Sequence, residues 1–136
     1  MRRLNTIIDY GSSTKRNVPI KLHAHRKESE VIKEIMLFLK FNRIYCWRNN
    51  AIGTPIKGGG FRPMKKKGIS DILGILEGGK FLAIEVKTPQ YYQITPEQRE
   101  FLLEINKRGG IGFVALCVED VKKQLSEYIK NYAWNG

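Results

Sequence analysis

The segment 68–87 most constrains what this chain can fold into. It reads GISDILGILEGGKFLAIEVK, in which two apolar runs flank a Glu-Gly-Gly-Lys turn. Two short apolar runs around a glycine turn are typical of paired antiparallel strands. Three ionisable residues, Asp71, Glu85 and Lys87, interrupt these runs. Because charge in a buried strand costs free energy unless it is paired or binds a metal ion, these three residues are candidates for a functional site.

The length of the turn decides the strand register. Side chains alternate along a strand, so Glu85 and Lys87 share a face. A three-residue loop over 77–79, with glycine in the left-handed conformation, places Asp71 opposite Glu85 on that face. A two-residue loop of the glycines alone places Asp71 opposite Val86 unless a bulge corrects the register. In the first register two carboxylates and one ammonium group converge, which predicts a divalent-metal site with a lysine beside it.

The spacing Asp-x13-Glu-x-Lys resembles the PD-(D/E)XK nuclease superfamily. Three segments make the chain similar to the VRR-NUC (virus-type replication-repair nuclease) branch: GISDILGIL, GGKFLAIEVKTP and TPEQREFL. The resemblance covers about residues 28–122. The chain departs from the family pattern at Ser70, where a proline is usual before the aspartate. That position shapes the start of the strand and binds nothing, so the assignment stands.

The pattern of the chain predicts seven regular elements and an α/β (α+β) class. Apolar residues at helical spacing predict a helix over 28–41, and Thr95 followed by Pro96 predicts the start of another. The complete expectation is a helix over 28–41, a strand over 44–48, a long basic loop over 51–67, the hairpin, a helix from Thr95 to about Arg108 closed by two glycines, a strand over 111–117, and a helix from Glu119 or Asp120 to about Tyr132. The resemblance implies a restriction-endonuclease-like αβββαβ core, with a mixed central sheet flanked by helices.

The length and the net charge of the chain limit the classes of partner that it can have. The chain has 136 residues, enough for one domain, and a formal net charge of +11. Such an excess favours a polyanion, most simply nucleic acid, although a basic surface without a specific partner would give the same balance. We expect a polar, basic N-terminal arm over 1–25, and a VRR-NUC-like nuclease domain over 26–136.

Other residues argue against zinc and against a membrane location. Cys46, Cys117, His23 and His25 lack the paired spacing of a zinc site, and the cysteines are expected to be buried thiols in a reducing compartment. No apolar run has the length of a membrane span, and the first residues lack a signal-peptide core. The sequence therefore predicts a cytoplasmic protein, and the resemblance implies a bacterium or a phage-infected cell as its host.

Asp71, Glu85 and Lys87 suit phosphodiester hydrolysis. Mg²⁺ or Mn²⁺ binds through few carboxylates while keeping waters, and it neutralises charge that builds on a phosphate. We expect Asp71 and Glu85 to be direct ligands, and the resemblance adds the carbonyl of Val86. Lys87 would hold or polarise the attacking water. The alternative is a buried ion pair at a strand end without a metal ion.

Two helical residues are further candidates. Glu28 lies on the same helical stripe as Ile32 and Ile35, so we expect it to be the metal-side carboxylate rather than Glu30 or Glu34. An acid near a helix N-terminus is stabilising without any site, which is the alternative. Gln98 lies on the inner stripe of its own helix. It either faces the metal or phosphate, as the resemblance implies, or forms a capping box with Thr95, and both can hold together.

Basic residues near the hairpin are expected to contact phosphates. Such contacts would give salt-sensitive binding that tolerates different sequences, although a charged run is more often only a solvated surface. We expect Tyr91 and Tyr92 to pack rather than stack on a base. The predicted DNA-binding residues are Arg48, Asn49, Lys57, Arg62, Lys65, Lys66 and Lys67, with Asn50 and the basic residues of the N-terminal arm (Arg2, Arg3, Lys15 and Arg16) as further candidates.

Together these features predict a Mg²⁺- or Mn²⁺-dependent DNA endonuclease. By resemblance, small members of the branch cut branched DNA, such as Holliday junctions, as homodimers, so we expect structure-selective cleavage and a homodimer. Two alternatives remain: a nicking, flap or restriction-type nuclease on the same core, and a non-catalytic module that binds nucleic acid.

Overall fold

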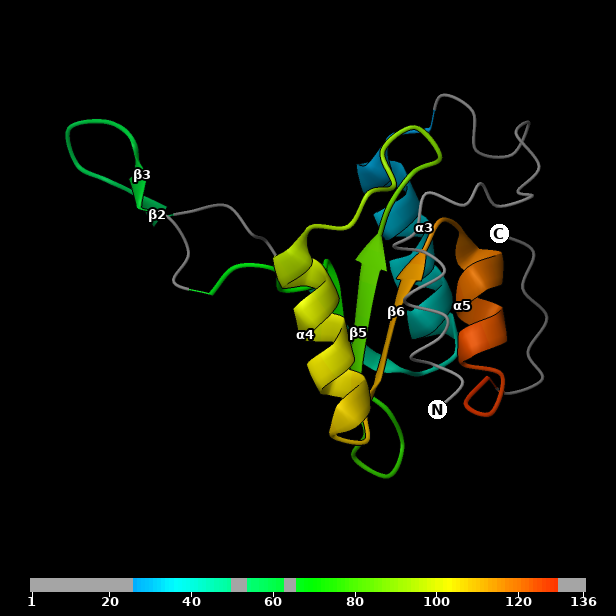
Figure 1. Cartoon of the computed structure of the whole chain (residues 1–136). Helices are drawn as coiled ribbons and strands as arrows, with labels where there is room; N and C mark the ends of the chain where they lie inside the picture. Colours follow the sequence, from blue (N-terminus) through cyan, green and yellow to red (C-terminus); the bar gives the residue numbers. More distant parts are fainter. Residues whose placement is uncertain (1–25, 50–53, 63–65, 130–136) are drawn as a thin grey trace.

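The computed structural model describes residues 26–49, 54–62 and 66–129 (Figure 1). Its regular elements, in chain order, are α3 (Glu28–Phe41), β1 (Tyr45–Arg48), β2 (Thr54–Pro55), β3 (Phe61–Arg62), β4 (Ile72–Ile75), β5 (Phe81–Val86), α4 (Pro96–Lys107), β6 (Ile111–Ala115) and α5 (Val118–Gln124). The N-terminal arm expected over 1–25 and both histidines lie outside the described residues. No helix within the described ranges has the length and apolar character to cross a bilayer.

Four strands form a mixed sheet in the order β1-β4-β5-β6. The pairs β1–β4 and β4–β5 are antiparallel, whereas β5 and β6 are parallel and joined by α4. The predicted α+β class with a mixed sheet flanked by helices is therefore confirmed. When β2 and β3 are set aside, the element order is also the predicted α-β-β-β-α-β-α.

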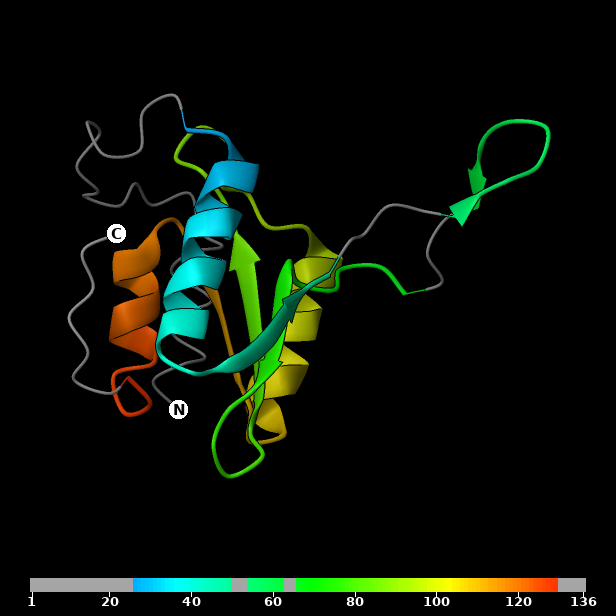
Figure 2. The ribbon, with the colours of Figure 1, turned by 180° about the vertical axis from the view of Figure 1, so that it is seen from behind.

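The alternation of side chains along β5 separates two layers of core. Leu82, Ile84 and Val86 pack with α3 and α5 on one face of the sheet. Ala83 lies on the other face, where it packs with Leu102 of α4. Figures 1 and 2 show α3 and α5 on one side of the strands and α4 on the other.

Close packing fixes α4 against β6. Gly112 leaves no room for a side chain, because a Cβ there would lie 3.1 Å from the Leu102 carbonyl oxygen. The Asn106 Nδ2 donates to the Gly112 carbonyl at 2.8 Å, and the Gly112 N–H donates to Asn106 Oδ1 at 3.0 Å. The helix ends as predicted at the two glycines, with Gly109 at a φ of +89°. These contacts fix the position of α4 on the sheet and therefore also the position of its first turn.

Three local expectations were wrong. The predicted loop over 51–67 carries a small antiparallel hairpin, β2–β3, that projects from the body around three glycines (Figure 1). α5 ends at Gln124 rather than about Tyr132, because the chain tightens into a turn in which the Tyr128 N–H donates to the Leu125 carbonyl at 2.9 Å. Both cysteines are free but only half-buried.

Candidate functional site

The register of the β4–β5 hairpin brings the predicted carboxylates together. Ile72 pairs with Ile84, and the Leu76 N–H donates to the Lys80 carbonyl at 2.8 Å, so the loop comprises residues 77–79. Both loop glycines have a positive φ, +89° at Gly78 and +87° at Gly79. One step beyond the end of β4, this register sets Asp71 opposite Glu85. The three-residue alternative is confirmed.

At the start of β4, the Asp71 side chain accepts a hydrogen bond that a backbone carbonyl would accept in a regular sheet. The Val86 N–H donates to Asp71 Oδ2 at 2.8 Å, and the Asn49 N–H donates to the Asp71 main-chain carbonyl at 2.8 Å. The N–H and C=O of one strand residue point to the same side of the strand. The Val86 carbonyl therefore points toward β4, which is also the side on which Asp71 lies. A metal ion bound by both groups would require this arrangement.

Glu85 is buried with one oxygen satisfied and the other not. Gln98 Nε2 donates to Glu85 Oε1 at 2.9 Å, and Lys87 Nζ lies 3.5 Å from the same oxygen. Glu85 Oε2 is buried and has no hydrogen-bond partner among the described residues. Burial, and next the negative charge of Asp71, raise the pKa of Glu85 to about 9 against a smaller opposing effect of Lys87.

Gln98 forms the predicted capping box and also contacts Glu85. The Thr95 N–H donates to Gln98 Oε1 at 3.0 Å, and the Gln98 N–H donates to Thr95 Oγ1 at 3.1 Å, which completes a capping box. Because the cap occupies the amide oxygen, the amide nitrogen is the group left to face Glu85. The cap therefore orients the side chain toward the carboxylates.

Glu28 is the glutamate of α3 that lies near this cluster. It is half-buried, and burial followed by the charge of Asp71 raises its pKa, while Lys87 and Arg48 lower it. The other two candidates are engaged elsewhere: Glu30 accepts from the Lys27 N–H at 3.4 Å, and Glu34 pairs with Arg26. The helical stripe therefore predicted the position of Glu28 correctly.

The cluster lies where several element ends meet. Figures 1 and 2 show the arrowhead of β5 and the N-terminal turns of α3 and α4 at the same end of the sheet. β1 runs parallel to β5, because both pair antiparallel with β4, so Arg48 ends β1 at this end too. Helix N-termini carry partial positive charge, which favours carboxylates and phosphates beside them.

The donor set fits one hard divalent cation. Two neighbouring carboxyl groups, one with an unpartnered buried oxygen, and a backbone carbonyl on the same side are oxygen ligands of the kind that Mg²⁺ takes while keeping several waters. Within the described ranges no group of three or more His, Cys, Asp or Glu side chains converges closely enough to hold a metal ion. Glu28 thus fits a role through water better than direct ligation.

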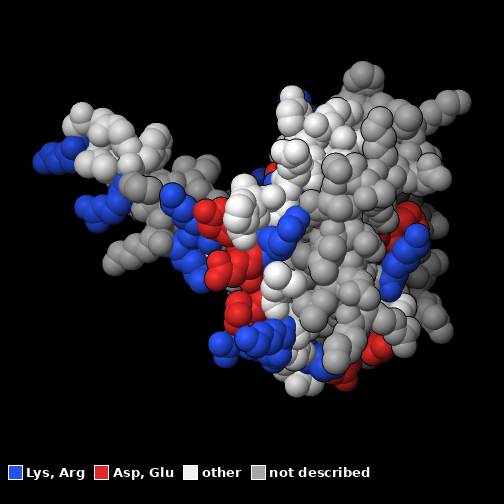
Figure 3. Space-filling model, in the orientation of Figure 1, with Lys and Arg blue, Asp and Glu red and all other residues white. Residues whose placement is uncertain are grey.

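The structure distributes the described members of the predicted DNA-binding set over three regions. Arg48 is exposed and Asn49 half-buried at the site, whereas Lys57 and Arg62 are exposed on the β2–β3 hairpin. Lys66 and Lys67 are exposed beside Glu97, Glu100 and Glu104 of α4, with which they line a pocket of about 630 Å³. Figure 3 shows basic side chains on the projecting hairpin and next to the acidic side chains. Lys65 and Asn50 lie outside the described residues.

Sequence reasoning missed two polar groups beside Asp71. Ser70 Oγ and Asn49 Nδ2 are both buried without a hydrogen-bond partner among the described residues. Asn49 was predicted only as a phosphate contact, and Ser70 as a residue that binds nothing. Only the packing of β1 on β4 reveals them. Tyr92 packs against the α4 side of the core as predicted, but Tyr91 is 78% exposed, so its predicted packing was wrong.

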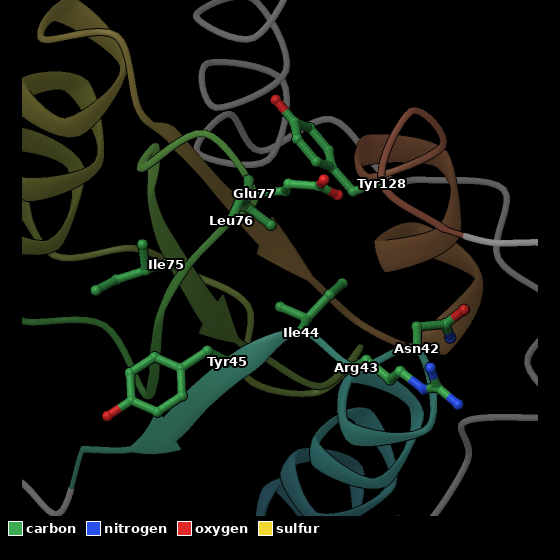
Figure 4. A pocket seen from close by; sticks show the side chains of 8 residues that line it. All are labelled: Asn42, Arg43, Ile44, Tyr45, Ile75, Leu76, Glu77 and Tyr128. Atoms are coloured by element: carbon green, nitrogen blue, oxygen red, sulfur yellow. The ribbon is translucent and has the colours of Figure 1, made fainter.

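A second hollow lies at the opposite end of the sheet. It has a volume of about 390 Å³ between the end of α3, the β4–β5 loop and Tyr128 (Figure 4). None of the predicted site residues lines it.

Comparisons with protein-family models, with curated proteins and with solved structures gave no match. The similarity to the VRR-NUC branch therefore rests on the motifs of the sequence.

Proposed function

We propose that this protein is a divalent-metal-dependent endonuclease that hydrolyses phosphodiester bonds in DNA. The observation that carries the proposal is the close pairing of the buried Glu85 carboxyl with the Asp71 carboxyl, which hydrogen-bonds to it, with Lys87 and Gln98 on Oε1 and no nitrogen donor on Oε2. A buried carboxylate is costly, and without a cation the raised pKa of Glu85 relieves that cost by keeping the carboxyl protonated; a bound cation would relieve it instead and leave both carboxylates ionised. The αβββαβ element order is compatible with the restriction-endonuclease-like core that the resemblance implies.

Each residue of the candidate site has a separate role in hydrolysis. Water attacks the phosphorus and loses a proton to solvent, a new P–O bond forms, and the bond to the leaving oxygen breaks as that oxygen takes up a proton from solvent. When bound between Asp71, Glu85 and the Val86 carbonyl, Mg²⁺ or Mn²⁺ would neutralise charge on the phosphate and the leaving oxygen. Lys87 holds the attacking water and stabilises the negative charge of the transition state. Gln98 positions Glu85, and Glu28 accepts a hydrogen bond from a water at the edge of the site.

Partners follow from the same proposal. Arg48 lies at the site, and Lys57 and Arg62 extend the basic surface, so DNA would bind mainly through its phosphates. The finer form of the proposal is structure-selective cleavage of branched DNA by a homodimer, in which two sites make paired cuts.

The test is cleavage of matched linear duplex, single-stranded, flap and four-way-junction DNAs with Mg²⁺, Mn²⁺ or EDTA. We expect metal-dependent cleavage by the wild type and a loss of at least about 100-fold in Asp71→Ala, which should hold DNA as tightly or more tightly because a negative charge is removed. Glu30→Ala is the matched control, since this carboxylate is exposed and belongs to a helix cap.

Failure to cleave any substrate, by a folded and metal-supplied wild type that still binds DNA, would favour the non-catalytic binding module. Selective cutting of junctions, together with a dimer mass in solution, would support the finer form. Cutting of linear duplex or flaps alone would favour the nicking, flap or restriction-type alternative.

A further inference from the structure

An exposed aromatic strip lies on the face of the sheet that carries the candidate site. Tyr45 is 69% exposed, Trp47 38% and Ile75 42%. α4 packs on β5 and β6, through Leu102 against Ala83 and Val114, and leaves these three side chains of β1 and β4 open. Single exposed apolar residues are normal on a protein surface, but these three form one patch.

The strand register makes these residues one surface. Tyr45 pairs with Ile75 and Trp47 pairs with Leu73, so the side chains of both pairs lie on one face. The Tyr45 and Trp47 rings contact each other, with their centroids 5.7 Å apart. Figure 4 shows Tyr45 and Ile75 on one side of the two strands and Ile44 and Leu76 on the other.

The strip is continuous with the carboxylates. Every second side chain of a strand lies on the same face, so one face of β4 carries Asp71, Leu73 and Ile75. Neighbouring members of this series are about 7 Å apart. Trp47, opposite Leu73, is thus about one such distance from Asp71, and Tyr45 about two. A polymer whose phosphate lies at Asp71 and Glu85, and which runs from there along β1, would pass over Trp47 and then Tyr45.

The chemistry of the strip favours nucleotide bases. Its largest members are a tryptophan and a tyrosine, whose flat rings are the surfaces on which unpaired bases stack. The next residue of β1, Arg48, is exposed and cationic on the opposite face of the strand, so it adds charge near the strip but is not part of it. The whole chain carries a net charge of +11, which favours a polyanion as the occupant of this surface.

We propose that Tyr45 and Trp47 form a stacking platform for two unpaired nucleotides next to the phosphate at the carboxylate site. The proposal rests on the proposed nuclease function and narrows its substrate. Bases inside a duplex are already stacked on one another, so the platform selects DNA with a single-stranded segment beside the cut.

The experiment measures DNA binding in EDTA, where no cleavage occurs. Fluorescence anisotropy would compare a labelled oligothymidine with a fully paired hairpin duplex, for the wild type and Tyr45→Leu/Trp47→Leu. Leucine keeps an apolar surface but cannot stack. We expect the double variant to lose about 10- to 100-fold in affinity for oligothymidine and less than about threefold for the duplex. Trp47→Phe should retain most of the affinity.

Two controls keep the outcome clear. Leu37→Ala removes an apolar side chain that is 60% exposed on α3, away from the strip, and should change neither affinity. Tyr45→Leu alone, at a position that is 69% exposed, gives a folded variant if the double substitution destabilises β1.

Three results would overturn the platform: unchanged affinity for oligothymidine, an equal loss on both DNAs, or a wild-type dimer that Tyr45→Leu/Trp47→Leu converts to a monomer. The last would make the strip a contact between two copies. Failure of the nuclease proposal is seen separately, as absent Asp71-dependent cleavage, and selective loss on oligothymidine would then place the platform in a binding module.

Discussion

At the scale of single residues, Glu85 has a protonation state that depends on folding. Its pKa is about 9 in the folded chain against an ordinary value of 4.5. Between these values the folded state binds a proton that the unfolded state has lost, so the free energy of unfolding falls as pH rises. Loss of this stability begins near pH 4.5 and is complete near pH 9, provided that no cation is bound.

Glu85→Gln tests this dependence, because glutamine resembles the protonated carboxyl and cannot ionise. In EDTA at pH 8 we expect the variant to be more stable than the wild type, and its stability to change less between pH 5 and pH 9. Urea unfolding at several pH values measures both. Parallel pH curves for the two proteins would contradict a raised pKa at Glu85.

At the scale of elements, Gly68 allows the segment before β4 to pack closely against the start of α4. It has a φ of +82°, and a Cβ there would lie 2.4 Å from the Glu97 carbonyl carbon. We expect Gly68→Ala to destabilise the fold by about 2 kcal/mol or more, since conformational strain and a backbone clash add. The change should also move Gln98 relative to Glu85 and lower activity.

The matched control for Gly68→Ala is Gly59→Ala in the β2–β3 hairpin. Gly59 also has a positive φ, +111°, but no atom lies within 4 Å of an added Cβ. Strain alone should cost about 1 kcal/mol there. Thermal unfolding compares the two variants, and equal losses would mean that the contact with α4 contributes nothing.

Elements with strong local signals could be predicted from the sequence. The glycine loop limited the partner of Asp71 to Glu85 or Val86, between which the structure decides for Glu85, and Thr95 with Pro96 predicted the start of α4. The β2–β3 hairpin was missed because strands of two residues are too short to show a period. The unpartnered groups of Ser70 and Asn49 depend on how β1 packs on β4, which no local pattern encodes.

At the scale of the whole molecule, a charge of +11 predicts DNA affinity that falls steeply with salt. Lys57 and Arg62 are exposed on a hairpin that projects from the body, so replacing both with alanine should leave the melting temperature unchanged. If each contacts one phosphate of a duplex, the slope of log K against log salt should become less negative by about 1.8.

Lys80→Ala is the control for this pair, because Lys80 is equally exposed but lies at the β4–β5 loop, at the opposite end of the sheet. Binding titrations between 50 and 200 mM salt, about the range over which phosphate contacts weaken most visibly, give the slopes. An equal change for Lys80→Ala would mean that the charge acts at long range rather than through contacts made by the hairpin.

The loop at 77–79 has a consequence for how this gene can diverge. It is exposed and distant from the carboxylates, a place where natural chains usually gain and lose residues freely. Here a single-residue deletion keeps Asp71 against Glu85 only if the loop shortens to a two-residue turn between Leu76 and Lys80. A loop that stays three residues long by taking in Lys80 would pair Leu76 with Phe81 and set Asp71 against Val86. Descendants that keep the site should therefore vary this loop in sequence but rarely in length, and a length change should come with a two-residue turn or with a compensating bulge in one strand.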